Sequence, residues 1–326
     1  MCICRRSRGW ATGSIGTISR TIKSNQEQGF MDQIMHGIFP VVQTAVTDDG
    51  ELDIPSLEKE VGFCIDCGVH GLVFPVLGSE FQYLTEGERQ QLLEVVVAQA
   101  GGQVPVVAGV AGTSKAQALE CARRAATTQA DAFIALPPYL SGATAAEMGD
   151  YYKAIAQVAQ RPVFIQHTQA GLSASFMRQL FEEVEHIDYL KEEAPPSAHQ
   201  ISAVVGQIGD ACLGVFGGGH GRWMMSELRR GATGFMPAAE LVDVHVQVWD
   251  AFQAGDEAGA RRLFNQLLPH INLILLLGLG VCKEVLVRRG VLASAQMRIP
   301  GSQQLDEEDQ REIDAILADL APLLRQ

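Results

Sequence analysis

Among the six lysines of the chain, one lies where its amine could act as a nucleophile. Lys191 comes at the end of an apolar run and is followed by two glutamates. A lysine held away from water gives up its proton more readily, and the neutral amine can attack a carbonyl carbon to form a Schiff base. The others fall in the N-terminal segment or in helical patterns: Lys23, Lys59, Lys115, Lys153 and Lys283.

The two glutamates after Lys191 are expected to face opposite ways. Side chains alternate along a strand, so Glu193 shares the face of Lys191, whereas Glu192 takes the other face. A carboxylate at residue 193 could take a proton from C3 of a 2-keto acid once an iminium at C2 has acidified that carbon. The alternative is purely structural, with Lys191 in an ion pair with Glu192 or Glu193 at the rim.

Eight short apolar runs alternate with stretches of helix length, and Lys191 lies in the sixth run, where the predicted strand ends. Continuous apolar runs are typical of parallel strands covered on both faces. Eight even strand–helix units predict a (β/α)₈ TIM barrel with additional C-terminal helices, although a doubly wound sheet is the alternative. In a barrel, the chemistry lies at the carboxyl ends of the strands. The runs span residues 37–46, 71–78, 104–112, 131–139, 161–168, 188–194, 211–219 and 231–239.

The pattern divides the chain into three parts. Residues 1–36 form a basic leader, which is either a transit peptide or an upstream start-site artefact; we favour the artefact, with Met31 as the true start. Residues 37–241 hold the barrel strands and helices. Residues 242–326 hold the last barrel helix and a helical extension.

Composition excludes several classes of protein. The net charge of −13 argues against a nucleic-acid partner. The most apolar segment, residues 271–281, is too short to cross a bilayer, so we expect no membrane association. Seven scattered cysteines indicate a reduced, cytoplasmic protein. Cys64 and Cys67 form a single CxxC without a second pair, so we expect no metal site.

An ordered set of motifs covers the chain from about residue 37 to 300. Through these motifs and their order along the chain, the sequence resembles the dihydrodipicolinate synthase/N-acetylneuraminate lyase superfamily of class I aldolase-type enzymes. The resemblance implies that Lys191 forms the Schiff base with a small 2-keto acid, that no cofactor is needed, and that the protein is a homotetramer. The motifs are GIFPVVQTAVTDDGELD (37–53), LGSEFQYLTEGER (77–89), GVAGTS (109–114), PPY (137–139), YLKE (189–192), RRGATGFMPA (229–238) and KEVLVRRGVL (283–292).

The chain departs from the family pattern at residues that matter for chemistry. The family's general acid/base tyrosine at the end of strand five is replaced by Gln166, which cannot exchange a proton at neutral pH. Gly78 and Ser79 stand where the family has paired threonines at the carboxylate-binding turn. These changes disfavour the lysine-biosynthetic condensation and the cleavage of sialic acids.

A glutamine in place of the tyrosine resembles the pattern of L-2-keto-3-deoxyarabonate dehydratases. We therefore expect a hydro-lyase that dehydrates 2-keto-3-deoxyarabonate to 2-oxoglutarate semialdehyde, with Lys191, Glu193 and Gln166 as catalytic residues. One alternative is a class I aldolase that releases pyruvate and an aldehyde. Another is a non-catalytic barrel that binds keto acids, which the retention of Lys191 and Glu193 disfavours.

Other residues at the carboxyl ends of strands are candidates for binding the substrate or for moving a proton. His167 and His220 could each protonate the leaving hydroxyl, and either could instead be a structural histidine. The substrate-binding candidates are Gly78, Ser79, Tyr139, Gly218 and His220.

Overall fold

The computed structural model describes residues 34–139, 142–168, 172–302 and 304–325. Residues 35–326 belong to one compact unit. The leader expected at residues 1–36 lies almost wholly outside the described residues. No helix among the described residues is long and apolar enough to cross a membrane.

Eight parallel strands form one sheet in the order β1-β8-β7-β6-β5-β4-β3-β2. Val41, just after β1, is bridged both to Val73 of β2 and to Ala238 beyond β8, so the sheet curls until its two edges meet. This closure is consistent with the expected (β/α)₈ barrel. The strands are β1 (Gly37–Ile38), β2 (Leu72–Phe74), β3 (Val106–Gly109), β4 (Ala132–Ala135), β5 (Val163–His167), β6 (Ile187–Glu192), β7 (Gly214–Gly217) and β8 (Gly234–Phe235).

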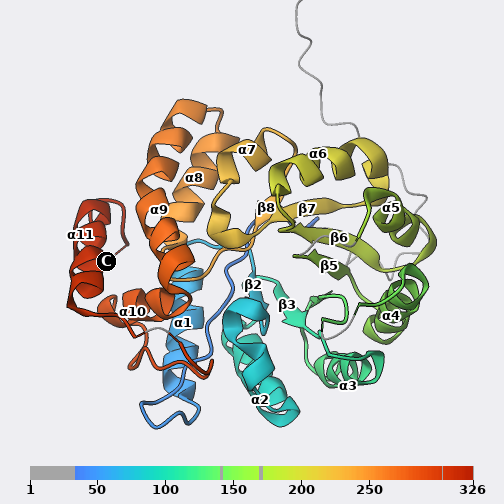
Figure 1. Ribbon diagram of the computed structural model, residues 1–326, viewed down its shortest axis with the longest axis horizontal. Coiled ribbons are helices and arrows are strands. Elements are labelled where there is room, and N and C mark those ends of the chain that lie inside the picture. Colours follow the sequence, from blue (N-terminus) through green and yellow to red (C-terminus); the bar gives the residue numbers. More distant parts are fainter. Residues whose placement is uncertain (1–33, 140–141, 169–171, 303, 326) are drawn as a thin grey trace, which may run out of the picture. The chain divides into compact units, whose positions relative to one another are not determined.

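A helix follows each strand, and Figure 1 shows these helices arranged around the sheet. Several begin with the caps that the sequence indicates; in α2, the hydroxyl of Thr85 accepts from the backbone N–H of Glu88. The helices are α1 (Ile54–Asp66), α2 (Glu86–Ala100), α3 (Lys115–Ala126), α4 (Ala145–Ala159), α5 (Ala174–Glu183), α6 (Ser197–Ile208), α7 (Met224–Leu228) and α8 (Val242–Gln253).

Three further helices complete the C-terminal part, as the sequence predicts. They are α9 (Glu257–Leu277), α10 (Gly280–Arg288) and α11 (Glu307–Leu320). Figure 1 shows α10 and α11 beside α1 and α9 rather than among the helices around β4 to β6.

The seventh helix is shorter than the sequence suggests. The helical pattern in the sequence runs over residues 222–230, but α7 spans only Met224–Leu228, and a 3-10 turn, Gly219–Gly221, precedes it. Gly219, His220 and Gly221 all have positive φ, a conformation that no α-helix accommodates. The chain therefore makes a tight turn here before α7 starts.

The buried side chains form two separate layers, and the strands alternate between them. Phe164, Tyr189 and Phe216 pack together inside the curled sheet. Ile165, Leu190 and Val215 pack outward against the helices. This alternation sets the direction of every side chain at the carboxyl ends of β5, β6 and β7.

Candidate active site

Lys191 and Gln166 lie side by side on adjacent strands. They are register partners in the pairing of β5 with β6. Each follows an interior residue by two positions, Phe164 on β5 and Tyr189 on β6, so both side chains continue the interior face. Lys191 is only 4% exposed. Lys191, the candidate nucleophile, therefore lies inside the curled sheet, as expected.

Glu193 lies beside the amine of Lys191. Its Oε2 atom is 3.3 Å from Lys191 Nζ and accepts a hydrogen bond of 2.9 Å from Gln166 Nε2. Its Oε1 atom accepts a bond of 3.0 Å from the backbone N–H of Gly219. Lys191 and Gln166 thus both contact the Glu193 carboxylate, and the glutamine amide orients it.

The glycine at residue 218 makes room for this carboxylate. A Cβ atom there would lie 2.2 Å from Glu193 Oε1 and 2.4 Å from Glu193 Cδ, far inside normal contact distance. Gly218, which we expected to bind substrate, therefore lets the backbone of the β7–α7 turn approach Glu193 closely.

The contacts of Glu193 favour its ionised form. Burial alone would raise the pKa of Glu193, but the charge of Lys191 and the hydrogen bonds from Gln166 and Gly219 outweigh burial and lower this pKa. An ionised carboxylate beside the amine can take a proton from the substrate after the Schiff base forms.

Glu192 and His167 face the other way, toward the helices. His167 Nδ1 lies 2.9 Å from Glu192 Oε2, and both side chains are buried. Glu192 Oε1 also accepts from the backbone N–H of Ala194. The outward direction predicted for Glu192 is thus confirmed. His167 shares that outward face, so the idea that it protonates a substrate inside the sheet is wrong.

The turn after β2 is held by hydrogen bonds to the segment that follows β1. Ser79 is fully buried, and its hydroxyl donates a bond of 2.6 Å to the carbonyl of Val42. The Thr44 hydroxyl donates to the carbonyl of Ser79. A Cβ atom at Gly78 would lie 3.1 Å from Val41 Cγ1, so the turn packs tightly against the segment that follows β1. Thr44, in the segment after β1, thus holds this turn, and no sequence motif marks it.

Tyr139 is more exposed than the other candidates. It is 39% exposed and makes an edge contact with Phe81, with ring centroids 5.9 Å apart. Partial burial raises the pKa of its phenol, which is therefore neutral at neutral pH. Tyr139 can offer a hydroxyl and an aromatic edge, but not a phenolate.

His220 is held in a left-handed conformation, with φ of 58°. Its carbonyl accepts a hydrogen bond of 3.1 Å from a ring nitrogen of His245. Burial lowers the pKa of the His220 imidazole, so the ring is neutral at neutral pH. The preceding residue, Gly219, holds Glu193, so His220 belongs to the turn that shapes the site.

Two buried carboxylates and their hydrogen-bond partners were not predicted from the sequence. His270 Nε2 lies 3.0 Å from Glu240 Oε1. Burial opposes ionisation of Glu240, but the hydrogen bond and charge of His270 lower its pKa to about 2. Glu227 in α7 accepts a bond from the hydroxyl of Ser197, and burial raises its pKa to about 7. Each pair joins distant segments, so no local motif reveals it.

Lys283 is the other fully buried lysine of the described chain, and it is already engaged. Its Nζ atom lies 2.6 Å from Glu80 Oε1 and donates a bond of 2.7 Å to the carbonyl of Gln296. Glu80 in turn accepts backbone bonds from Arg298 and Ile299. This lysine thus fastens the C-terminal segment to the turn after β2, and Lys191 remains the candidate nucleophile.

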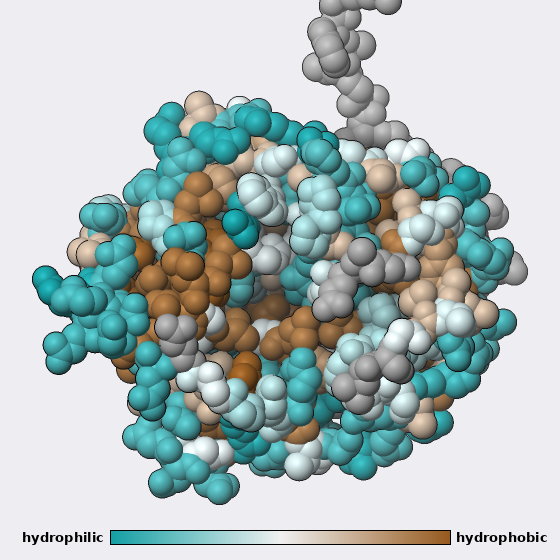
Figure 2. All heavy atoms as spheres, viewed as in Figure 1, coloured by the Kyte–Doolittle hydropathy of each residue, from teal (hydrophilic) through white to brown (hydrophobic). Residues whose placement is uncertain are grey.

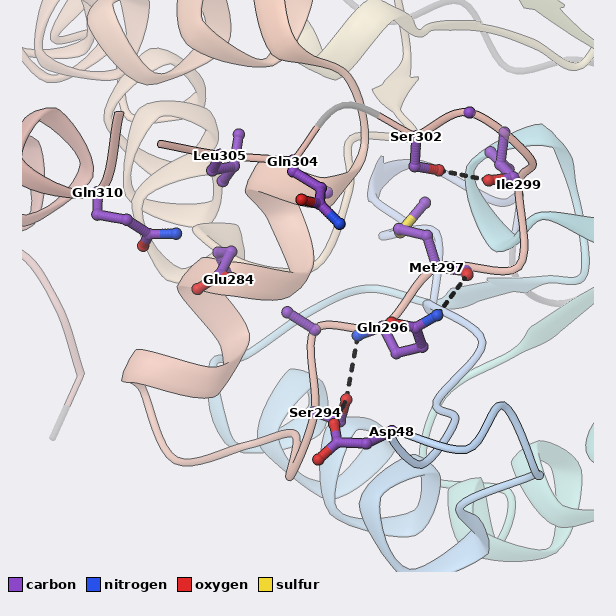
Figure 3. A pocket seen from close by; sticks show the side chains of 13 residues that line it. Asp48, Glu284, Ser294, Gln296, Met297, Ile299, Ser302, Gln304, Leu305 and Gln310 are labelled. Carbon is purple, nitrogen blue, oxygen red and sulfur yellow. Dashed lines mark hydrogen bonds between the residues drawn. The ribbon is translucent and has the colours of Figure 1, made fainter. Parts of the chain in front are cut away.

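A cavity of about 540 Å³ lies between α10, α11 and the segment of residues 294–305. Figure 3 shows its mostly polar wall, which includes Asp48, Gln296 and Gln310. Lys191, Glu193 and Gln166 are not among the residues that line it. This cavity is therefore separate from the candidate active site, despite its size.

Comparison with known proteins agrees with this geometry. The profile of the dihydrodipicolinate synthetase family matches residues 34–320. L-2-keto-3-deoxyarabonate dehydratase of Azospirillum brasilense is 31% identical over 299 residues, which cover 88% of this chain and 95% of the relative. The putative 2-dehydro-3-deoxy-D-gluconate aldolase YagE of Escherichia coli K12 is 26% identical over 292 residues, covering 87% and 96%.

Solved structures give the same fold. The crystal structure of YagE with pyruvate superposes with a TM-score of 0.83 at 24% identity and covers 90% of this chain and all of that chain. The dihydrodipicolinate synthase of Rhodopseudomonas palustris superposes with a TM-score of 0.80 at 25% identity, covering 87% and 97%. By sequence and by fold, this chain belongs to the dihydrodipicolinate synthetase family.

Proposed function

We propose that the protein is a Schiff-base-forming lyase with a (β/α)₈ barrel that dehydrates a sugar-derived 2-keto-3-deoxy acid. The substrate that we favour is 2-keto-3-deoxyarabonate, and the product is 2-oxoglutarate semialdehyde. One observation carries the proposal. The carboxylate of Glu193 lies 3.3 Å from the amine of Lys191 and is held by Gln166, which occupies the position of the family's tyrosine.

The reaction begins when Lys191 gives up its ammonium proton and the resulting neutral amine attacks C2 of the keto acid. Loss of the C2 oxygen as water leaves an iminium, which makes the protons on C3 acidic. Glu193 takes one of these protons, and the resulting enamine expels the C4 hydroxyl, which leaves as a second water after gaining a proton. Proton shifts then convert C5 from alcohol to aldehyde, and hydrolysis of the iminium, which uses one water, releases Lys191. The net change is the loss of one water.

Gln166 favours this route over carbon–carbon cleavage. Retro-aldol cleavage needs a base for the proton of the C4 hydroxyl, and an amide cannot accept it at neutral pH. Dehydration instead needs a base at C3, and Glu193 is close enough to the Schiff-base nitrogen to serve. The similarity to an L-2-keto-3-deoxyarabonate dehydratase also supports dehydration.

Cleavage to pyruvate is the second candidate function. It is favoured by similarity to relatives named as aldolases, including the probable 2-dehydro-3-deoxy-D-pentonate aldolase YjhH of E. coli K12, at 27% identity over 239 residues. Those residues cover 71% of this chain and 79% of that relative. In an aldolase, another group would have to accept the C4 hydroxyl proton.

The identity of the product separates these candidates. The purified protein is incubated with 2-keto-3-deoxyarabonate while pyruvate is followed with lactate dehydrogenase and total products by mass spectrometry. We expect a product lighter than the substrate by one water and no pyruvate. Rapid release of pyruvate would establish the aldolase, and binding without turnover of any 2-keto-3-deoxy acid would indicate a non-catalytic keto-acid-binding protein.

We also propose that the protein is a homotetramer of the cytoplasm. Support for assembly comes from apolar side chains gathered over the region of α9 and α10 in Figure 2. Near the end of α9, Leu275 and Leu276 are 46% and 67% exposed. Exposed apolar patches of this kind often mark subunit contacts. Light scattering during gel filtration measures the mass directly, and a monomer would contradict the proposal.

A further inference from the structure

Three side chains with metal-binding atoms lie close together at the β7–α7 turn, which also holds Glu193. His220 lies in that turn, Glu240 lies between β8 and α8, and Cys282 lies in α10. One nitrogen, one carboxylate oxygen and one sulfur from these residues all lie within 4.8 Å of one another. The chain brings the three together from separate segments.

Two of these groups have polar atoms without a partner outside the cluster, among the described residues. Glu240 is 1% exposed; its Oε2 atom has no hydrogen-bond partner outside the cluster, and within the cluster the Cys282 thiol is hydrogen-bonded to the Glu240 carboxylate. The buried Nδ1 atom of His220 also has no partner outside the cluster. Buried polar atoms are nearly always satisfied, so a buried carboxylate oxygen and a buried imidazole nitrogen without partners outside the cluster point to a positive group between them, either a proton or a cation.

The surroundings fix the orientation of two of the groups. His270 Nε2 contacts the other oxygen of Glu240 at 3.0 Å, so His270 does not occupy Oε2. A ring nitrogen of His245 contacts the carbonyl of His220 at 3.1 Å and fixes the turn. Partners of this kind commonly orient the ligands of a metal site.

We propose that His220, Glu240 and Cys282 form a binding site for a divalent cation of the zinc class. Imidazole, carboxylate and thiolate suit Zn²⁺ and Co²⁺, whereas Ca²⁺ and Mg²⁺ prefer oxygen ligands alone. Three protein ligands leave one position of a tetrahedral ion for water. The sequence predicts no metal site; its one CxxC pair has Cys64 in α1 and Cys67 just after that helix.

The bound cation would join the β7–α7 turn to α10. The turn carries Gly219, whose N–H holds Glu193, so the metal supports the position of that carboxylate without entering the reaction. Because it binds the folded chain, the cation should also raise the melting temperature.

Cobalt binding tests the site independently of the proposed function, since no turnover is measured. The full-length protein is reduced, stripped with a chelator, desalted and titrated with Co²⁺. We expect about one cobalt per chain, with visible absorption bands, a near-ultraviolet thiolate-to-cobalt band and displacement by Zn²⁺. Zn²⁺ should also raise Tm.

Two matched variants identify the ligand. Cys282→Ser should abolish the thiolate band and weaken Zn²⁺ binding by about 100-fold or more, since even changes to groups around the ligands cost roughly 10- to 100-fold. Cys64→Ser should retain both the thiolate-to-cobalt band and the affinity for Zn²⁺. The proposal is overturned if the wild type binds no cobalt, if the band survives Cys282→Ser, or if it disappears only in Cys64→Ser. Should Cys282→Ser not fold, Glu240→Gln provides a second test, with weaker Zn²⁺ binding expected.

Discussion

Gly218 and Glu193 occupy adjoining space so closely that residue 218 has no room for a side chain. A Cβ atom there would lie 2.2 Å from Glu193 Oε1, and the obstructing atoms are the carboxylate itself. The glycine therefore sets where the candidate base can lie relative to Lys191.

The first prediction follows from this contact. Gly218→Ala should displace the Glu193 carboxylate and lower kcat by about 10²-fold or more, within the usual range for loss of a positioned base. The control is Gly62→Ala in α1, where the nearest atom to the new Cβ is 3.8 Å away. Steady-state kinetics and circular dichroism of both variants check it; full activity of Gly218→Ala would contradict this account of the turn.

The second prediction separates Schiff-base formation from proton transfer. Glu193→Gln should still form the Schiff base but lose turnover by about 10²- to 10⁴-fold, because an amide cannot accept the C3 proton. Gln166→Ala should be milder, since it removes only the hydrogen bond to Glu193 Oε2. Single-turnover kinetics with borohydride quenching measures both steps. A larger defect in Gln166→Ala than in Glu193→Gln would reverse the roles assigned to them.

The third prediction concerns which lysine reacts. Borohydride in the presence of pyruvate should add one reduced adduct per chain, and peptide mapping should locate it on Lys191. Lys283 is the informative comparison because it is equally buried but lies 2.6 Å from Glu80 and bonds to Gln296. Lys191→Arg should abolish labelling while keeping a positive charge. An adduct on Lys283, or labelling that survives Lys191→Arg, would remove the central claim.

The fourth prediction uses the buried carboxyl of Glu227, whose pKa burial raises to about 7. An acid with a raised folded-state pKa is protonated in the fold, so stability falls as pH rises from about 4.5 to about 7 and the cost is complete above that range. Glu227→Gln cannot ionise and keeps an acceptor for the Ser197 hydroxyl. It should therefore stabilise the protein at about pH 8, by on the order of 3 kcal/mol at most, and change little at about pH 5.

Thermal denaturation at the two pH values measures the effect. The exposed Glu182→Gln serves as control and should shift neither transition. An equal change in Tm for Glu227→Gln at both pH values would show that Glu227 does not titrate as described.

Local patterns in the sequence were enough to predict the positions of the strands and the direction of the side chains at the end of β6. Each predicted apolar run overlaps one strand, although β6 begins one residue before its run, because a parallel strand covered on both faces needs a continuous apolar segment. Two-residue alternation also predicted that Lys191 and Glu193 share a face while Glu192 turns outward, since the side-chain direction along a strand is fixed by the backbone.

Alternation applied to the fifth strand would likewise have excluded His167. Gln166 faces inward, so its neighbour had to face the helices, where it meets Glu192 at 2.9 Å.

The remaining features depend on distances that no local pattern specifies. The Gly218–Glu193 contact, the Glu240–His270 pair and the meeting of His220 with Cys282 each join separate segments of the chain. By itself, the sequence determined which residues lie on which face of which strand. Only the closing of the sheet and the packing of α10 beside α9 decided which of those faces meet, because these contacts are set by the three-dimensional path of the whole chain.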